Sequence, residues 1–417
     1  MANGGTHWWD QGQEQLRRER KAVQFQAIKE ALGPEVRIFP DDDDPGGAQY
    51  LYKDRIVLTR AQNADEVLGE LGLTDQNRSD DDPVPGVTTI TVPQGNQWAD
   101  HKAVFDHLDQ RFGPGFAMPD FVVHITTTGG CPAIEPIPWP DVVPDPPLSA
   151  DANAGDDKTL IVLDSGVRQD VVNDHSWLKD VDGVAEQPGQ VGNVYQGHGT
   201  FVAGVARTMA PKVGVEVRSL GYRHGALLES SFAPLLSKAL DDSPDIINMS
   251  AGVSTRNGKP PIALRLVCDR LADPAVKSVL VASAGNDMTS DPFFPAALPH
   301  VVSVGALDAS RKRAGYSNWG PWVQVYAQGS DLANAYPKGA HNYGEPPYGQ
   351  GAHAHFDKGM AQWSGTSFSA PLVAGLIAAR MTKHAETAKQ AWASLLAKAA
   401  TQVGGDSGPR LFPGDEV

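Results

Sequence analysis

The chain has 417 residues, a formal charge of −15 and only two cysteines, Cys131 and Cys268. This length predicts two or three folding units, and the negative charge excludes general binding to nucleic acid. No segment approaches the run of about 20 apolar residues that spans a membrane, and residues 1–10 lack the basic start and apolar core of a secretory signal. Two distant cysteines predict no disulfide framework. We therefore expect a cytoplasmic protein without nucleic-acid or membrane partners, with a non-standard export route as the alternative.

Residues 1–45 are expected to form a helix followed by an acidic linker. Apolar residues recur at helical spacing between Gln11 and Leu32, and a Gly-Pro pair at 33–34 ends the pattern. The run Asp41–Asp44 lies before a Pro-Gly-Gly turn. Because consecutive aspartates repel one another, we interpret this run as a solvated linker rather than a metal site.

Residues 46–127 show the pattern of a small α+β unit. Strand-like and helical segments alternate in the order β-α-β-α-β, at 50–59, 64–71, 87–92, 98–112 and 121–125. Short connections join them. This order predicts a ferredoxin-like sandwich, in which two helices cover one face of a single sheet.

A proline-rich stretch separates this unit from the rest of the chain. Seven prolines between Cys131 and Pro147 exclude a helix, so residues 128–150 are expected to be an extended linker. From residue 151 to 404, short apolar runs alternate with helical segments, the runs lying at 159–163, 213–220, 246–249, 278–282 and 301–304. This alternation predicts a doubly wound, mostly parallel α/β sheet whose sites lie at the carboxyl ends of its strands. Residues 405–417 are left as a C-terminal tail.

Four polar residues occur where that rule places functional groups. Asp164 ends the first apolar strand, His198 opens a helix between two glycines, and Asn286 follows another strand. Ser367 stands in Gly-Thr-Ser at the start of an apolar helix that we expect to carry Pro371 in its first turn. Each residue alone is also explained as a helix cap or a turn residue. Together they occur in the order Asp, His, Ser that one class of serine proteases uses.

The chain resembles the subtilisin-like serine proteases, the subtilases, from about residue 151 to 404. The resemblance rests on successive motifs in the family's order, at 163–167, 197–204, 247–252, 282–286 and 365–371. It implies that Ser367 is the nucleophile, His198 the general base and Asp164 the residue that orients the imidazole. It also implies that Asn286 donates its side-chain N–H to the oxyanion beside the backbone N–H of Ser367.

The resemblance further implies how a peptide substrate is held. Ser250, Ala251 and Gly252 match the edge segment that pairs with extended substrates through main-chain hydrogen bonds. The first side-chain pocket is expected to be lined by this segment, by Ala284 and Gly285, and by Phe293 and Phe294. The paired phenylalanines predict a shallow pocket for small or medium apolar side chains.

Two parts of the chain depart from the family pattern. The segment after Asp164 does not reproduce the family's calcium site, although Asp170, Asn173 and Asp174 are candidate oxygen ligands. We therefore predict no required cofactor and assign no metal ligands, with calcium possible but not assignable. A long insertion at 329–359 contains three histidines, His341, His353 and His355. It is interpreted as a mobile surface loop near the cleft, with a zinc site as the alternative.

The resemblance suggests that residues 46–127 are a pro-domain, an intramolecular inhibitor and folding aid for the protease. The expected function is a self-inhibited serine endopeptidase that acts on protein or peptide substrates. One alternative is a dedicated maturation protease for a single partner polypeptide, with a permanent N-terminal regulatory domain. Another is a non-catalytic peptide-binding pseudoprotease, against which the intact set of four polar residues argues.

Overall fold

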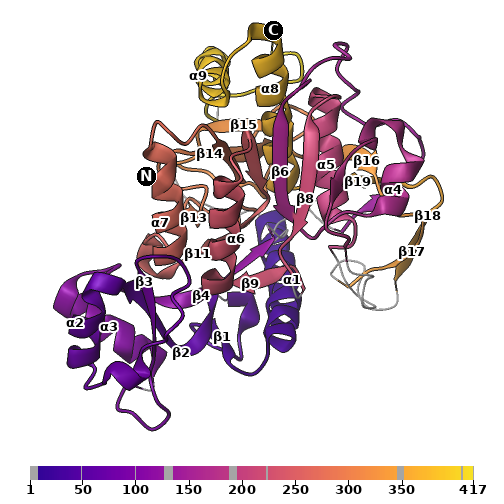
Figure 1. The fold of residues 1–417 in the computed structure, drawn as a ribbon. Helices are drawn as coiled ribbons and strands as arrows, with labels where there is room; N and C mark the ends of the chain where they lie inside the picture. The colour runs from indigo at the N-terminus through magenta and orange to yellow at the C-terminus, as the bar shows by residue number, and fades with distance from the viewer. Residues whose placement is uncertain are drawn as a thin grey trace, which may run out of the picture.

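The computed structural model describes residues 8–47, 49–98, 100–125, 135–186, 195–221, 224–344, 352–404 and 407–416 (Figure 1). Two seven-stranded sheets organise this part of the chain. One is parallel and is built from residues after 158. The other is antiparallel and joins strands from both sides of the proline-rich stretch. Cys131 lies outside the described residues, and Cys268 is buried without a disulfide.

The parallel sheet confirms the predicted doubly wound α/β fold. Its strands follow the order β15 (Val325–Gln328), β14 (Val301–Leu307), β12 (Val279–Ser283), β10 (Ile246–Met249), β6 (Thr159–Asp164), β8 (Gly214–Ser219) and β7 (Asp182–Gly183). One face is covered by α5 (His198–Met209) and α8 (Thr366–His384), and the other by α6 (Glu229–Asp241) and α7 (Ile262–Asp269) (Figure 1). Burial on both faces explains why these strands read as continuous apolar runs.

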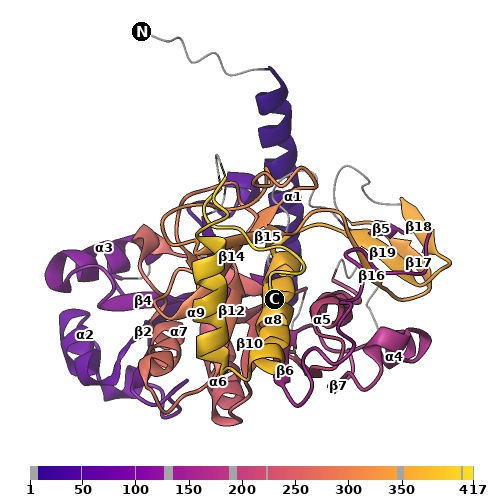
Figure 2. The same ribbon diagram turned by 90° about the horizontal axis from the view of Figure 1, so that it is seen from above.

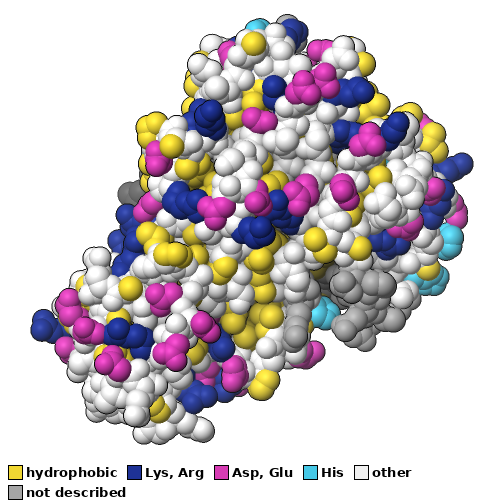
Figure 3. All heavy atoms as spheres, in the orientation of Figure 1, with side chains coloured by type: hydrophobic (Ala, Val, Ile, Leu, Met, Phe, Trp, Pro, Cys, Tyr) yellow, Lys and Arg dark blue, Asp and Glu magenta, His cyan; other side chains and the backbone are white. Residues whose placement is uncertain are grey.

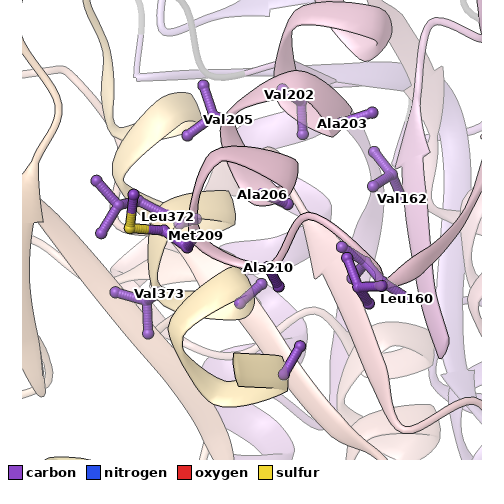
Figure 4. Close-up of a cluster of buried hydrophobic side chains, with 14 of the residues drawn as sticks. Leu160, Val162, Val202, Ala203, Val205, Ala206, Met209, Ala210, Leu372 and Val373 are labelled. Atoms are coloured by element: carbon purple, nitrogen blue, oxygen red, sulfur yellow. The ribbon is translucent and has the colours of Figure 1, made fainter. Parts of the chain in front are cut away.

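The packing of α5 against α8 depends on small residues. Figure 4 shows Met209 of α5 beside Leu372 of α8, and Ala203 of α5 near Val162 of β6; all belong to one buried cluster. A Cβ atom on Gly375 would lie 2.5 Å from the Ala206 carbonyl oxygen. Glycine at this position therefore allows the two helices to cross closely, and these are the helices that begin at His198 and Thr366.

The front unit has the predicted element order, with one additional strand. It contains β1 (Val36–Phe39), β2 (Tyr50–Arg60), α2 (Ala64–Glu70), β3 (Val87–Thr91), α3 (His101–Phe112) and β4 (Ala117–Ile125). Apolar side chains of α2 and α3 share one buried cluster with β2, β3 and β4. The strand β1 was not predicted because its alternating pattern covers only four residues.

The antiparallel sheet continues beyond the front unit. The strand β4 pairs with β2. The carboxyl-terminal half of β4 pairs with β9 (Ala226–Leu228) and, at its end, with β11 (Ala251–Ser254). In turn, β11 pairs with β13 (Phe293–Phe294). The helix α1 (Trp8–Leu32) packs beside β1 and β9, near the middle of Figure 1. The sheet therefore connects the front unit directly to the α/β part.

The insertion before Ser367, predicted as a mobile surface loop, contains strands in its described residues. Four strands occupy its described residues and the segment after it: β16 (Leu332–Ala335), β17 (Gly339–Asn342), β18 (His353–Phe356) and β19 (Met360–Trp363). The linker contributes β5 (Ile137–Pro138), which pairs with β19. Tyr336, Phe356 and Trp363 belong to the main core, which explains the ordered structure. Residues 345–351 lie outside the description. Figure 2 shows the front unit and these strands at opposite ends of the parallel sheet.

Short elements complete the described chain. They are α4 (Gln169–Asp174), α9 (Ala388–Ala399) and the 3-10 turns η1 (Pro45–Gly47), η2 (Ala61–Asn63), η3 (Asp75–Asn77), η4 (Ser176–Leu178), η5 (Arg256–Gly258) and η6 (Arg270–Ala272). On the face in Figure 3, acidic and basic side chains are interspersed. Exposed ion pairs contribute at most about 1 kcal/mol each, so the buried apolar clusters hold the fold. Among the described helices, none has the length and apolar character to cross a membrane.

Candidate active site

Three neighbouring strands deliver polar residues to one edge of the parallel sheet. Asp164 is the last residue of β6, Ser250 follows β10, and Asn286 lies three residues after β12. In a parallel sheet the carboxyl ends of adjacent strands meet at the same edge. The fold therefore brings together residues that are 86 and 36 positions apart, as the sequence predicts.

Asp164 and His198 form a buried pair. His198 is the first residue of α5, and the preceding Gly197 adopts a positive φ of 75° that turns the chain into the helix. The imidazole Nδ1 lies 2.7 Å from Asp164 Oδ1. The backbone N–H of Ser165 donates to the same oxygen, at 2.7 Å. Because a carboxylate only accepts, Nδ1 is the donor, and the neutral ring then presents Nε2 as a base.

Ser367 is the second residue of α8, as predicted, but Pro371 lies in the second turn rather than the first. An ordinary residue at 371 would donate its N–H to the carbonyl oxygen of Ser367, four residues earlier. Proline has no such N–H. The Ser250 hydroxyl donates to that carbonyl instead, at 2.8 Å. Ser250 itself accepts from the Asn248 amide at 3.0 Å, so the strand end of β10 fixes the start of α8.

Asn286 is oriented by the residue before Ser367. Its Oδ1 accepts from the Thr366 backbone N–H at 2.9 Å and from the Thr366 hydroxyl at 2.8 Å. Its Nδ2 lies 3.5 Å from the position that a Cβ on Gly365 would occupy, and Ser367 N lies 3.7 Å from the same position. The side-chain amide of Asn286 and the backbone N–H of Ser367 thus both lie close to Gly365, at the start of α8.

Asn318 is a supporting residue that no sequence pattern indicates. Its Oδ1 accepts from the backbone N–H groups of Asp287 and Thr289, and its Nδ2 donates to Ala284 O at 2.9 Å. These bonds hold the turn that carries Asn286. Asn318 is distant in the sequence and stands in no recognisable motif, so only the structure identifies it.

The predicted substrate segment forms the edge of the site. Ala251 and Gly252 begin β11, and Ala284 and Gly285 lie directly before Asn286. The two phenylalanines differ in their surroundings. The Phe293 ring lies against Gly252 and Gly285, where a Cβ would approach it to 2.3 Å and 3.1 Å. Phe294 instead belongs to the apolar core under the sheet.

Aromatic side chains surround His198. The rings of Trp363 and Phe368 each lie 5.3 Å from the imidazole centroid, and that of Tyr195 lies 6.4 Å away. The insertion also reaches this corner, because Pro337 and Tyr336 pack against Gly197. Within the insertion, His341 is buried between the Tyr336 hydroxyl at 3.0 Å and Glu135 at 3.2 Å.

The candidate calcium ligands do not fit a shared metal site. The Arg168 guanidinium holds Asp170 through two hydrogen bonds, and Lys338 pairs with Asp174 at 2.8 Å. Asn173 accepts from the Gln169 amide on the same helix. Among the described residues, no group of three or more acidic, histidine or cysteine side chains is arranged to hold a metal ion.

Comparisons with known proteins identify the family of this part of the chain. The model of the Subtilase family matches residues 141–412. A thermophilic serine proteinase from Bacillus sp. (strain AK1) is 32% identical over 192 residues, covering 43% of this chain and 41% of that protein. Subtilisin E from Bacillus subtilis (strain 168) is 29% identical over 259 residues, covering 57% and 59%. The chain thus spans 41% and 59% of the length of these relatives.

Solved structures share the fold. A lanthipeptide protease superposes with a TM-score of 0.51 at 23% identity, over 64% of this chain and 88% of that one. Fervidolysin from Fervidobacterium pennivorans, a keratinolytic enzyme related to subtilisin, superposes with a TM-score of 0.56 at 17% identity, over 88% and 61%. At these identities, the likeness concerns the fold alone.

Proposed function

The chain belongs to the subtilase family, and from this premise we propose that it is a serine endopeptidase whose triad is Asp164, His198 and Ser367. The observation that carries the proposal is the buried hydrogen bond of 2.7 Å between His198 Nδ1 and Asp164. Asp164 is fully buried and His198 nearly so. An imidazole held in this tautomer beside the start of α8 is arranged to act as a general base.

The proposed reaction uses only groups of this chain. His198 removes the hydroxyl proton of Ser367 as Ser367 Oγ attacks the scissile carbonyl, and Asp164 stabilises the imidazolium that forms. The Asn286 amide and the Ser367 backbone N–H donate to the oxyanion. His198 then returns the proton to the leaving amine, which leaves an acyl-enzyme for water to hydrolyse. No cofactor enters this scheme.

The front unit is proposed to inhibit the site by taking the place of a substrate strand. Its strand β4 runs antiparallel to β11, with Ile125 opposite Ala251 and His124 opposite Gly252. A peptide that adds to this edge would use the same main-chain groups. The carboxyl end of β4 is directed toward Ser250, whose hydroxyl contacts Ser367. This register supports a self-inhibited precursor.

The N-terminal helix adds a second contact across the site. The Gln24 amide donates to the Tyr195 hydroxyl at 2.9 Å, on the histidine side. Lys21 lies 3.9 Å from Asp287, which follows Asn286 on the opposite side. Between them, the Phe25 ring packs against His124 of β4. We therefore propose that α1 and the front unit together form the intramolecular inhibitor.

One observation favours the alternative of a dedicated protease with a permanent front unit. The apolar cluster around Phe25 and Ile28 joins α1 and β4 to Ala226 and Leu228 of β9, in the catalytic part. A buried interface of this kind is suited to a lasting association. In this case protein substrates would be restricted to those able to displace β4 from β11.

The test compares the full chain with Ser367→Ala by intact mass over time. The control is Ser369→Ala, which removes another buried hydroxyl from α8; among the described residues this hydroxyl donates to the Thr366 carbonyl. The precursor proposal predicts that wild type and S369A, but not S367A, lose an N-terminal fragment cut after Ile125 and before Gly155. If all remain whole, a fluorophosphonate probe distinguishes the outcomes. Labelling that requires Ser367 supports the permanent-domain alternative. Absence of labelling even in Phe25→Ala, which weakens the contact of α1 with the catalytic part, refutes the protease.

A further inference from the structure

We propose that Glu186 is a positioning residue that holds His198 and Asp164 in the geometry that catalysis requires. The inference rests on the proposed function, because it assigns a role within that site. Glu186 follows β7 and carries no motif, and no expectation from the sequence included it. Its side chain is nevertheless one of the few buried carboxylates near the triad.

The Glu186 carboxylate contacts both sides of the catalytic pair. The backbone N–H of Gly197, directly before His198, donates to its two oxygens at 2.8 Å and 3.0 Å. The hydroxyl of Ser165, directly after Asp164, donates to Oε1 at 2.9 Å. That hydroxyl also accepts from the backbone N–H of Gly199 at 3.1 Å. The carboxylate thus binds Gly197, before His198, and Ser165, after Asp164. Through the Ser165 hydroxyl it is also linked to Gly199, after His198.

The backbone of Glu186 is itself fixed. Val167 donates its N–H to Val184 O at 2.9 Å, and Glu186 donates its N–H to Val167 O at 2.9 Å. This bridge anchors Glu186 to the segment that leaves β6 after Asp164. Gly166 makes the approach possible, because a Cβ there would lie only 2.9 Å from the Glu186 backbone nitrogen. These contacts therefore hold in place the backbone that carries the carboxylate.

The charged and titratable groups around Glu186 shift the pKa of its carboxyl in opposite directions. Burial raises the pKa of its carboxyl to about 7, and the negative charge of Asp164 adds to this rise. The hydrogen bonds from Gly197 and Ser165 and the charge of Arg168 lower the pKa. Tyr336 also faces this region, and burial keeps the pKa of its hydroxyl well above the ordinary value. Glu186 therefore gains a proton within the working range of a histidine base.

The ionised carboxylate is the form that suits these donors. It accepts from Gly197 and from Ser165 together, which leaves the Ser165 oxygen free to accept from Gly199. A protonated or amide side chain presents a donor where an acceptor is needed. One of the bonds is then lost, and the turn that aims the imidazole is loosened. Displacement of a catalytic group by about 1 Å costs up to about 100-fold in rate.

The test uses Glu186→Gln in the full chain, with kcat and KM measured after the wild type has become active. We expect kcat to fall about 10-fold to 100-fold, with KM unchanged because Glu186 lies outside the substrate segment. In the wild type, protonation of Glu186 on the acid side loosens the turn before His198, so log(kcat/KM) should fall more steeply with decreasing pH than in E186Q, which lacks this titrating carboxyl. We expect Glu186→Asp to restore part of kcat and the steeper acid limb.

The matched control is Glu229→Gln. Glu229 is a fully buried carboxylate that accepts from the backbone N–H groups of Ala263 and Leu264, on the opposite face of the sheet from α5 and α8. A wild-type kcat and acid slope in E186Q would overturn the inference. It would also be overturned if E186Q and E229Q lost the same share of kcat after each value is corrected for the fraction of folded protein. A wild type without Ser367-dependent activity would instead refute the proposed function, and this inference with it.

Discussion

The docking of α1 over the site can be weakened without touching any catalytic group. Phe25 is 3% exposed and packs in one cluster with Ile28, Val122 and Ala226. Replacing a buried phenylalanine by alanine costs about 3–5 kcal/mol. Because about 1.4 kcal/mol corresponds to a tenfold change in an equilibrium constant, the lower value increases the undocked fraction of α1 about 100-fold. We therefore expect Phe25→Ala to expose Ser367 more often.

The assay measures the rate at which a fluorophosphonate probe labels Ser367 in the full chain. The variant S367A gives the background labelling. The F25A variant should label about 100-fold faster, up to the limit set by the fully open enzyme. Ile28→Val, which removes one buried methyl group and costs about 0.5–1.5 kcal/mol, should give an increase of about 2-fold to 12-fold. Val23→Ala serves as the control, since Val23 lies on the same helix but is 41% exposed.

Hydrogen exchange at the amides of α1 shows whether the helix has been released. If α1 controls access to the site, labelling and exchange increase together through the series V23A, I28V and F25A. Rapid exchange of α1 in F25A with Ser367 labelled at the wild-type rate would refute this control. In that case, α1 would pack on the front unit without controlling access to the site.

Two further predictions follow from the site and from the interface with the front unit. Asn286→Ala removes an oxyanion donor and should lower kcat about 10²-fold to 10³-fold with little change in KM; a loss below tenfold in steady-state kinetics would contradict the role. Burial raises the pKa of Asp120 on β4 from 3.8 to about 6 in the docked state, against Ser230 of α6. Docking therefore favours the protonated carboxyl, is strongest below about pH 4 and weakens as pH rises to about 6, by about tenfold per unit. Hydrogen exchange at β4 should show an opening constant that rises about 100-fold over this range in the wild type and stays level in Asp120→Asn; a pH-dependent D120N would show that another group is responsible.

Many local features of this protein could be predicted from short stretches of sequence. The run at 159–163 is apolar throughout because β6 is buried on both faces, and α5 begins at His198 because a glycine in a left-handed conformation precedes it. The position of Asp164 at the end of β6 follows from the same run. These features depend on neighbours along the chain, so periodicity and turn residues are enough to indicate them.

The insertion shows where such reasoning fails. Its glycines, tyrosines and histidines have no clear period, and they predict a loop. Tyr336, Phe356 and Trp363 become core residues through contacts with distant segments: Trp363 packs against Phe201 of α5, and Tyr336 packs against Phe356 and Trp363. The position of Pro371 in the second turn of α8 is a similar case. The Ser250 hydroxyl donates to the Ser367 carbonyl oxygen, which an N–H at position 371 would otherwise bind.

What the sequence determined by itself is the set of candidate catalytic side chains and the strands and helices that carry them. The tertiary structure decided which distant groups support that set: Asn318 at the turn of Asn286, Glu186 between the neighbours of Asp164 and His198, and α1 across the site. A contact between residues far apart in the chain leaves no periodic signal in either segment. Only the path of the folded backbone brings those partners within hydrogen-bond distance, so these contacts are visible only in the tertiary structure.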